Sequence, residues 1–397
     1  NSIVPAAPMS TVRLAFKRGP SAAVGRRIQA GLPAIHDFTG GVLRVLVCPT
    51  AFKESLSAGQ VADAVADGVR RALPGAEIET MPVSDGGPGL LDSLLEAEGG
   101  DLRVYEVHGP HGDAVTARSL WLSPTDVVIE TADACGLHLV PEISREPMRA
   151  DTTGVGELVA ACIDQGATDI VMGLGGSATV DGGTGLARVL GYRFLDEHGS
   201  DLPPGGGFLG LLARVEAGQP PVEKVAVTAI ADVRGPLTGP DGAARRFGPQ
   251  KGASPGAVEI LEAGLTRLGE RLSEDLGREV ADLPGAGASG GLGAGCAAFL
   301  GANLVSGSEW LLERLGFARA LDEADLVITG EGAWDATSDL GKITGEILLR
   351  AGAAGVPALL VCGRAAGPIP PGVTVVGAEA EWLDREDISR LVADALD

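Results

Sequence analysis

The chain has 397 residues, of which 45% are hydrophobic, and its formal net charge at pH 7 is −22. This size and apolar content suit two α/β domains with their own cores and exclude a disordered chain. The acidity argues against a nucleic-acid partner, although a local glycine-rich loop can still bind a nucleotide. No apolar run is long enough to span a membrane, so we expect no membrane partner.

The five cysteines predict a reducing compartment. Their number is odd, they lie in apolar stretches, and no C-x-x-C occurs. Buried free thiols in the cytoplasm are therefore expected, rather than disulfides or a metal site.

Residues 1–42 stand apart from the rest of the chain, because they contain five basic residues and one acidic residue. They lack the apolar core of a secretory signal. We expect a poorly ordered extension, either a leader or a cloning remnant, with no part in the chemistry.

The first part of the fold reads as alternating strands and helices. An apolar strand is predicted over 44–48, and a helix begins at Ser57 with Gln60 placed for a capping box. A second strand, 77–83, runs into the glycine-rich loop 84–89, after which another helix starts. This βαβα order predicts a parallel sheet.

The pattern changes between residues 102 and 131, where short alternating runs separated by turns predict antiparallel hairpins. Helix and strand patterns then alternate again, and strands are expected at 168–172, 225–231, 324–329 and 358–361. The fold class is therefore α/β, with one domain built on a parallel Rossmann-like sheet and one on a mixed sheet. The predicted limits are 43–95 with 285–397 for the first domain and 96–284 for the second.

A G-x-G-x-x-G match at 285–290 is not interpreted as a dinucleotide site. A proline and a polar run precede it, rather than a strand. We expect a glycine-rich helix start that packs closely against a neighbour.

The stretch 173–183, Gly-Leu-Gly-Gly-Ser-Ala-Thr-Val-Asp-Gly-Gly, is the centre of the predicted site. It joins a buried strand to a helix, and free N–H groups at a helix start favour a phosphate or carboxylate. A tight βα turn that needs glycine for steric reasons is the structural alternative. Three further loops follow strand ends and combine glycine with carboxylates, lysines or hydroxyls: 49–53, 85–89 and 330–342.

Four such loops in one α/β chain indicate a site that handles phosphate. Phosphoryl transfer requires a lysine on the phosphates, a carboxylate for Mg²⁺ and a carboxylate near the accepting hydroxyl. The candidates are Lys53, Lys251 and Lys342 for the first task, and Asp85, Asp181, Glu331 and Asp335 for the others. No Walker A loop, G-x-x-x-x-G-K-[ST], occurs.

Several motifs, in this order, resemble those of the type I glycerate kinase family, over about 43–363. They are Phe-Lys-Glu-Ser-Leu-Ser-Ala (52–58), Pro-Val-Ser-Asp-Gly-Gly (82–87), Gly-Val-Gly-Glu-Leu (154–158), Gly-Leu-Gly-Gly-Ser-Ala-Thr (173–179), Phe-Gly-Pro-Gln-Lys-Gly-Ala (247–253), Gly-Gly-Leu-Gly (290–293) and Ile-Thr-Gly-Glu-Gly (328–332). The resemblance implies two α/β domains with a cleft, and phosphorylation of glycerate by ATP with Mg²⁺.

On this reading Asp181, Asp85 and Lys53 are expected to be catalytic, with Asp181 as base or metal carboxylate. Expected nucleotide-binding residues are Gly175, Gly176, Ser177, Thr179, Gly330, Glu331, Gly332 and Lys342. Expected substrate-binding residues are Lys251, Asp232 and Asp335, and Asp181 and Glu331 are expected metal ligands. The expected protein is a cytoplasmic kinase, monomer or homodimer, that acts on a small molecule.

Some loop positions depart from the family pattern. Thr50-Ala51 replaces Asp-Ser, Pro88 replaces Glu, Val180 replaces Asn and Ala333 replaces Arg. These changes remove polar groups and keep the glycines. Two alternatives therefore stay open: a relative recruited to other chemistry, not necessarily phosphorylating, on a more apolar substrate, and a catalytically silent binding protein. The sequence also leaves open which hydroxyl is phosphorylated.

Overall fold

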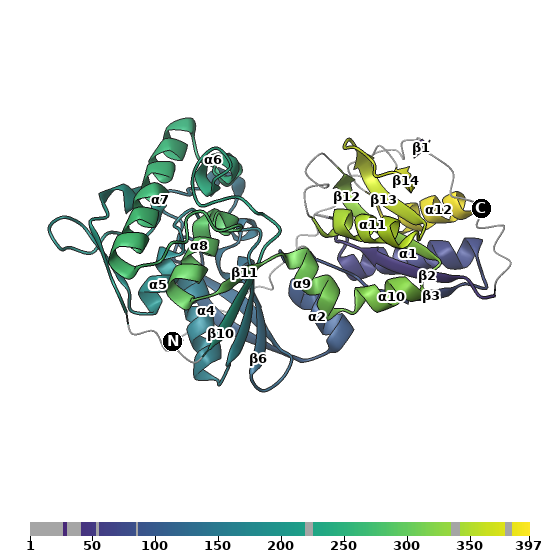
Figure 1. Ribbon diagram of the computed structural model, residues 1–397, viewed down its shortest axis with the longest axis horizontal. Coiled ribbons are helices and arrows are strands. Elements are labelled where there is room, and N and C mark those ends of the chain that lie inside the picture. The colour runs from purple at the N-terminus through teal and green to yellow at the C-terminus, as the bar shows by residue number, and fades with distance from the viewer. Residues whose placement is uncertain are drawn as a thin grey trace, which may run out of the picture.

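The computed structural model describes residues 27–29, 41–52, 55–84, 86–218, 225–334, 342–377 and 383–397. Two sheets, each covered by helices, lie next to each other along the long axis of the molecule (Figure 1). The predicted α/β class, with one parallel and one mixed sheet, is confirmed.

The first sheet contains five parallel strands in the order β14-β13-β12-β2-β3. Their bounds are β2 Arg44–Pro49, β3 Glu77–Thr80, β12 Leu326–Trp334, β13 Ala358–Ala365 and β14 Val373–Gly377. The short strand β1 (Arg27–Gln29) pairs antiparallel with β14 at the edge.

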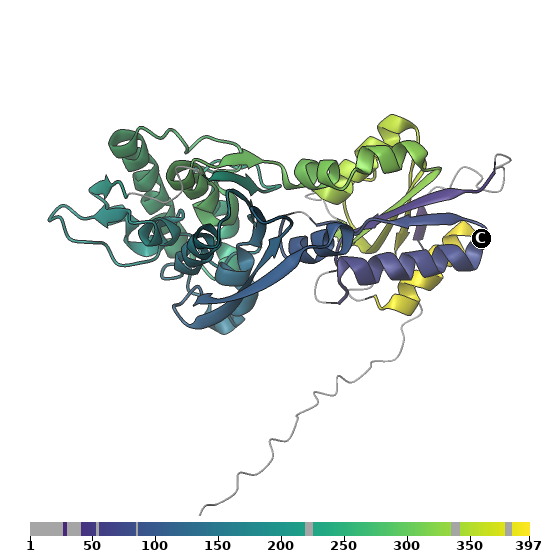
Figure 2. The same cartoon turned by 90° about the horizontal axis from the view of Figure 1, so that it is seen from below.

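Helices cover both faces of this sheet, as Figure 2 shows. On one face lie α1 (Ala58–Ala72) and α12 (Arg385–Leu396), and on the other α9 (Gly307–Arg314), α10 (Phe317–Glu323) and α11 (Ile343–Ala354). The predicted capping box at the start of α1 is present. Every fourth residue of α1 from Val61 to Val69 is buried, as the apolar pattern predicts.

The second sheet has the strand order β11-β10-β7-β6-β5-β4. Its strands are β4 Asp101–His108, β5 Ala114–Trp121, β6 Asp126–Glu130, β7 Asp169–Gly173, β10 Ala226–Ile230 and β11 Asn303–Val305. The first three are antiparallel, as predicted from the alternating runs, and β6, β7, β10 and β11 are parallel.

Helices and short turns complete this part of the molecule. They are α3 Ala132–Cys135, α4 Thr153–Asp164, α5 Thr184–Val189, α6 Ala243–Phe247, α7 Pro255–Leu276 and α8 Ala288–Leu300, with 3₁₀ turns η2 Leu137–Leu139, η3 Glu142–Ser144, η4 Gly206–Leu211 and η6 Pro249–Lys251 and the two-stranded pair β8 Arg193–Leu195 and β9 Arg214–Glu216. α8 and β11 lie with the mixed sheet, although the sequence grouped residues from 285 onward with the parallel one. The exact domain limits remain a prediction.

One apolar cluster joins the two sheets. It contains Leu46 and Val327 of the parallel sheet together with Leu120 and Val128 of the mixed sheet. Helix α2 (Leu90–Glu98) contributes three fully buried leucines to this cluster and lies between the two sheets (Figure 1). The packing therefore fixes the connection that leaves β3 and enters α2.

One predicted boundary is wrong. The sequence ended the strand before Gly330 and predicted a loop at Gly330-Glu331-Gly332. Instead β12 continues to Trp334, because its pairing with β13 extends that far, whereas its pairing with β2 stops at Gly330. Trp334 is fully buried and donates to the Pro368 carbonyl at 2.9 Å, which holds the extension in place.

The five cysteines are buried and free of disulfides, as predicted. In the described part of the chain, no helix combines the length and apolar character needed to cross a bilayer.

Candidate functional site

The loop 173–183 connects β7 to α5, and its last two glycines pack against α7 and α8. Gly182 and Gly183 have φ values of +64° and +78°, a conformation that side chains with a Cβ rarely adopt. The N–H groups of Gly175 and Gly176 donate to no acceptor among the described residues, and Gly176 is exposed. Those two N–H groups are available to an anion.

This loop lies directly against the loop 86–89. A Cβ on Gly173 would come within 2.5 Å of the Gly86 carbonyl oxygen, and one on Gly175 within 2.6 Å of the Gly87 Cα. Glycine is thus required at these positions by packing, as the structural alternative proposed. The same contact brings two of the predicted loops together. Asp85 itself lies outside the described residues.

Lys251, at the end of η6, places a buried positive charge beside this loop. Its Nζ donates to Ser177 Oγ at 2.9 Å and to the Thr179 carbonyl at 2.8 Å, and the residue is only 4% exposed. Burial lowers the pKa of Lys251 to about 8, because a desolvated ammonium is less stable than a hydrated one. We call Lys251 Nζ and the N–H groups of Gly175 and Gly176 the anion cradle.

Asp181 faces the protein interior and has no exposed surface. Its Oδ2 accepts from Thr152 N at 3.0 Å, Thr152 Oγ1 at 2.8 Å and Gly185 N at 3.0 Å, and its Oδ1 accepts from Gly183 N at 3.2 Å. Burial is the main cause that raises its pKa, and these donors oppose it. The carboxylate thus ties the start of α5 to the start of α4. The predicted catalytic and metal roles remain untested, and this bonding favours a structural one.

Asp232, which follows β10, binds the start of α9. Its carboxylate accepts from Ser308 N at 2.8 Å, Ser308 Oγ at 2.5 Å and Ser306 Oγ at 3.3 Å. A carboxylate is favoured at this position by the partial positive charge of the helix start.

The parallel sheet carries the remaining described candidates. Gly330, Glu331 and Gly332 lie on β12, and Lys342 directly precedes α11. Thr50 donates to the Gly330 carbonyl from its N–H at 2.9 Å and its Oγ1 at 3.1 Å, which links the ends of β2 and β12. Lys53 and Asp335 are outside the described residues.

The structure therefore brings together loops 86–89 and 173–177 and Lys251. Of the two predicted metal ligands, Asp181 lies in the loop that follows β7 of the mixed sheet, and Glu331 lies on β12 of the parallel sheet. Within the described ranges, no three His, Cys, Asp or Glu side chains are clustered as metal ligands.

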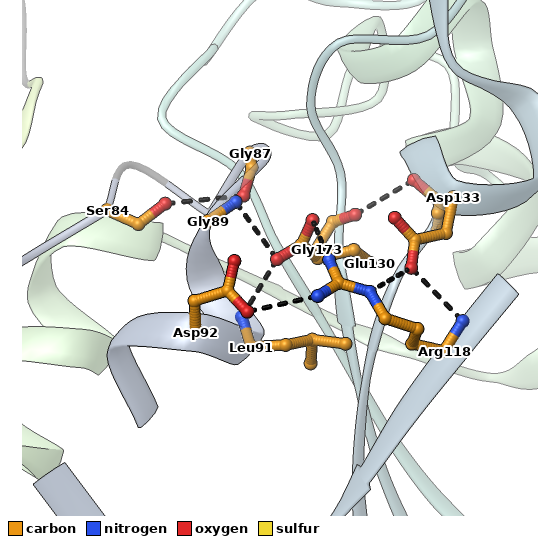
Figure 3. Close-up of polar contacts among 10 residues, drawn as sticks. Ser84, Gly87, Gly89, Leu91, Asp92, Arg118, Glu130, Asp133 and Gly173 are labelled. Atoms are coloured by element: carbon orange, nitrogen blue, oxygen red, sulfur yellow. Dashed lines mark hydrogen bonds and ion pairs between the residues drawn. The ribbon is translucent and has the colours of Figure 1, made fainter. Parts of the chain in front are cut away.

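Sequence reasoning missed Glu130, the last residue of β6. It is 2% exposed and accepts hydrogen bonds from Gly89 and Leu91, as Figure 3 shows. A carboxylate at the end of the apolar run Val-Val-Ile was the available signal, because a charged residue is rarely buried without partners.

Comparison with known proteins identifies the family. The profile of the glycerate kinase family matches residues 45–372. The chain belongs to this family. The match includes the whole mixed sheet and all the candidate residues described above, and it ends just before β14 of the parallel sheet.

Other members of the glycerate kinase family are similar over most of their length. The chain is 42% identical over 322 residues to the glycerate kinase of Halalkalibacterium halodurans, which covers 80% of this chain and 85% of that protein. It is 41% identical over 306 residues to the glycerate 2-kinase of Escherichia coli, which covers 76% of this chain and 80% of that protein. The crystal structure of a proposed glycerate kinase 2 from Salmonella typhimurium LT2 matches with a TM-score of 0.76 and 35% identity, covering 90% of this chain and 98% of that one.

Proposed function

We propose that this protein is an ATP-dependent glycerate kinase, a phosphotransferase with an alcohol acceptor. Membership of the glycerate kinase family supports the reaction. The observation that carries the proposal within the structure is the anion cradle, where Lys251 lies beside a glycine-rich loop with free N–H groups. Both reactants are anions, which such a group of donors suits.

The described residues fit a nucleotide with Mg²⁺. Backbone N–H groups and a lysine are the usual partners of phosphate oxygens, and Mg²⁺ needs only one or two protein carboxylates when phosphates supply other ligands. Glu331 is the proposed carboxylate among the described residues. When bound, Mg-ATP supplies the phosphoryl group, and the metal ion offsets the charge that develops during transfer.

The chain's own residues then bind and orient the reactants. We assign the N–H groups of Gly175 and Gly176, which have no acceptor among the described residues, to an anionic group of a reactant. The buried charge of Lys251 acts on that group at short range, because little water screens it. Ser177 and Thr179 hold the ammonium in place. Asp232, Gly330, Gly332 and Lys342 keep the substrate and nucleotide roles predicted from the sequence as part of this proposal.

A position that motivated the alternative functions lies in the core. Val180 is fully buried in the main apolar cluster of the mixed sheet, where an apolar side chain packs well. Its replacement of a polar residue therefore gives no support to a more apolar substrate. A cytoplasmic location and a monomeric or dimeric state also remain proposals.

The test is an ADP-release assay with D-glycerate and Mg-ATP, followed by identification of the phosphorylated hydroxyl in the product. Turnover that depends on both reactants is expected. Lys251→Met should lower kcat/KM by about 100-fold, the scale of a lost charged contact at a reacting site. Arg246→Met, an exposed arginine that pairs with Asp241 in the same segment, is the matched control and should change it little. Absence of turnover in the unmodified protein would refute the kinase proposal.

A further inference from the structure

Glu130 is a buried carboxylate with no role assigned so far. Its Oε1 accepts from Gly89 N at 3.0 Å and from Leu91 N at 2.8 Å, at the first turn of α2 (Figure 3). N–H groups at a helix start have no acceptor within the helix and carry a partial positive charge. Gly89 is in the left-handed conformation and supplies no side chain as a cap. Glu130 therefore caps α2 from a strand of the mixed sheet.

Charged side chains from three elements face this carboxylate. Arg118 of β5 donates from Nε to Asp133 Oδ2 of α3 at 2.9 Å and from Nη1 to Asp92 Oδ1 of α2 at 3.0 Å. Its Nη2 lies 4.0 Å from Glu130 Oε2. Burial raises the pKa of Glu130 to about 7, whereas the Leu91 N–H and Arg118 act in the opposite direction. The hydrogen bonds that hold Glu130 are therefore those from Gly89 N and Leu91 N, and Arg118 lies beyond hydrogen-bond distance of its other oxygen.

The segment before α2 belongs to a connection between the two sheets, which runs from β3 to β4. Residues 86–89 join the parallel sheet, through β3, to α2. Within this segment, Gly86 and Gly87 pack against Gly173 and Gly175, so close that neither partner glycine has room for a Cβ. Gly89 and Leu91, which donate to Glu130, follow these two glycines closely in the chain. A shift at Gly89 would therefore move the backbone that supports the anion cradle.

We propose that Glu130 is a positioning residue for phosphoryl transfer, which holds loop 86–89 against the anion cradle through the N–H groups of Gly89 and Leu91. The kinetic part of this proposal rests on the proposed kinase function. Small displacements of groups that orient reactants lower the rate of the chemical step. The requirement is for the reach of the acceptor oxygen, not for its negative charge.

Two variants separate reach from charge. Glu130→Asp keeps the charge but withdraws the oxygen by one methylene from both N–H groups. Glu130→Gln keeps an acceptor oxygen at the same distance and removes the charge. We expect kcat of Glu130→Asp to fall by about tenfold or more at saturating reactants, with a smaller change in KM, and kcat of Glu130→Gln to stay within about threefold.

Asp92→Asn is the matched control, because it alters the same cluster without touching the two N–H groups, and its kcat should be unchanged. Hydrogen exchange of the peptide that contains Gly89 and Leu91 gives a readout that does not need turnover. It should speed up in Glu130→Asp and not in Glu130→Gln. An active Glu130→Asp with an inactive Glu130→Gln, or equal exchange in both, would overturn the proposal. A protein that shows the expected exchange but no turnover would instead refute the kinase function.

Discussion

At the scale of single residues, the charge state of Lys251 should be visible in ligand binding. Its pKa is about 8, below the ordinary value of 10.5, because of burial. The ammonium is present below this pH and is lost as pH rises above it, so the affinity for an anion should weaken above about pH 8. Binding of the anion stabilises the ammonium and shifts the loss to higher pH.

Calorimetric titration with glycerate and with Mg-ATP between pH 7 and pH 9.5 measures this effect. The reactant bound at the anion cradle should lose up to about tenfold in affinity per pH unit on the alkaline side. Lys251→Met should bind weakly at all these pH values. A wild-type alkaline loss that persists in Lys251→Met would show that another group titrates.

Asp181 provides a second prediction at this scale. Asp181→Asn replaces one of the two carboxylate oxygens by an N–H₂ group. Because both oxygens accept hydrogen bonds, at least one buried N–H or O–H donor then loses its acceptor. We expect the free energy of unfolding to fall by about 2 kcal/mol in urea titrations. If Asp181 is structural, kcat per folded molecule should stay within about tenfold. A loss of about 1,000-fold in a stably folded variant would instead support the catalytic role expected from the sequence.

At the scale of elements, the glycine-rich start of α8 packs closely against residues 179–180, as the sequence predicts for a neighbouring segment. The sequence did not predict that its backbone is strained at Ser289. Ser289 has φ +50°, and it is the one non-glycine residue with positive φ in the described part of the chain. Its Oγ is buried and has no hydrogen-bond partner among the described residues. Both features lower the stability of the fold. The next residue, Gly290, has no room for a Cβ, because that atom would lie 1.9 Å from the Thr179 carbonyl oxygen.

Two substitutions in this turn should therefore have opposite effects. Ser289→Gly should raise the free energy of unfolding by about 1 kcal/mol, because it removes the left-handed strain and the buried hydroxyl. Gly290→Ala should lower it by about 3 kcal/mol, because the turn must move away from Thr179. Urea unfolding measures both. A stable Ser289→Gly variant with impaired turnover would assign the hydroxyl to the reaction.

At the scale of the whole molecule, ligands should stabilise the fold. The proposed nucleotide and substrate groups lie on both sheets, and a ligand that binds only the folded state adds RT ln(1 + [L]/Kd), about 2.7 kcal/mol at 100 times Kd. Mg-ATP and glycerate should each raise the thermal midpoint. Stabilisation by a small acid without any by Mg-ATP would favour the alternative in which the family fold serves other chemistry.

Local sequence determined much of the architecture. The capping box at Ser57, the buried stripe of α1 and the alternating runs of β4 to β6 depend on neighbours within a few residues, so they can be predicted from short windows. The glycine-rich loop was also recognisable, because its composition differs from that of an ordinary turn. The grouping of candidate residues at strand ends followed from the parallel order of the strands.

Only the tertiary structure decided what those residues contact. Asp181, expected from the sequence to be a base or a metal ligand, accepts four hydrogen bonds from the starts of two helices, which no spacing in the sequence reveals. β12 extends past Gly330 because a neighbouring strand continues, and Glu130 binds a helix about 40 residues earlier in the chain. Burial and long-range hydrogen bonding set the protonation and orientation of these groups, because both depend on segments that meet only in the folded chain.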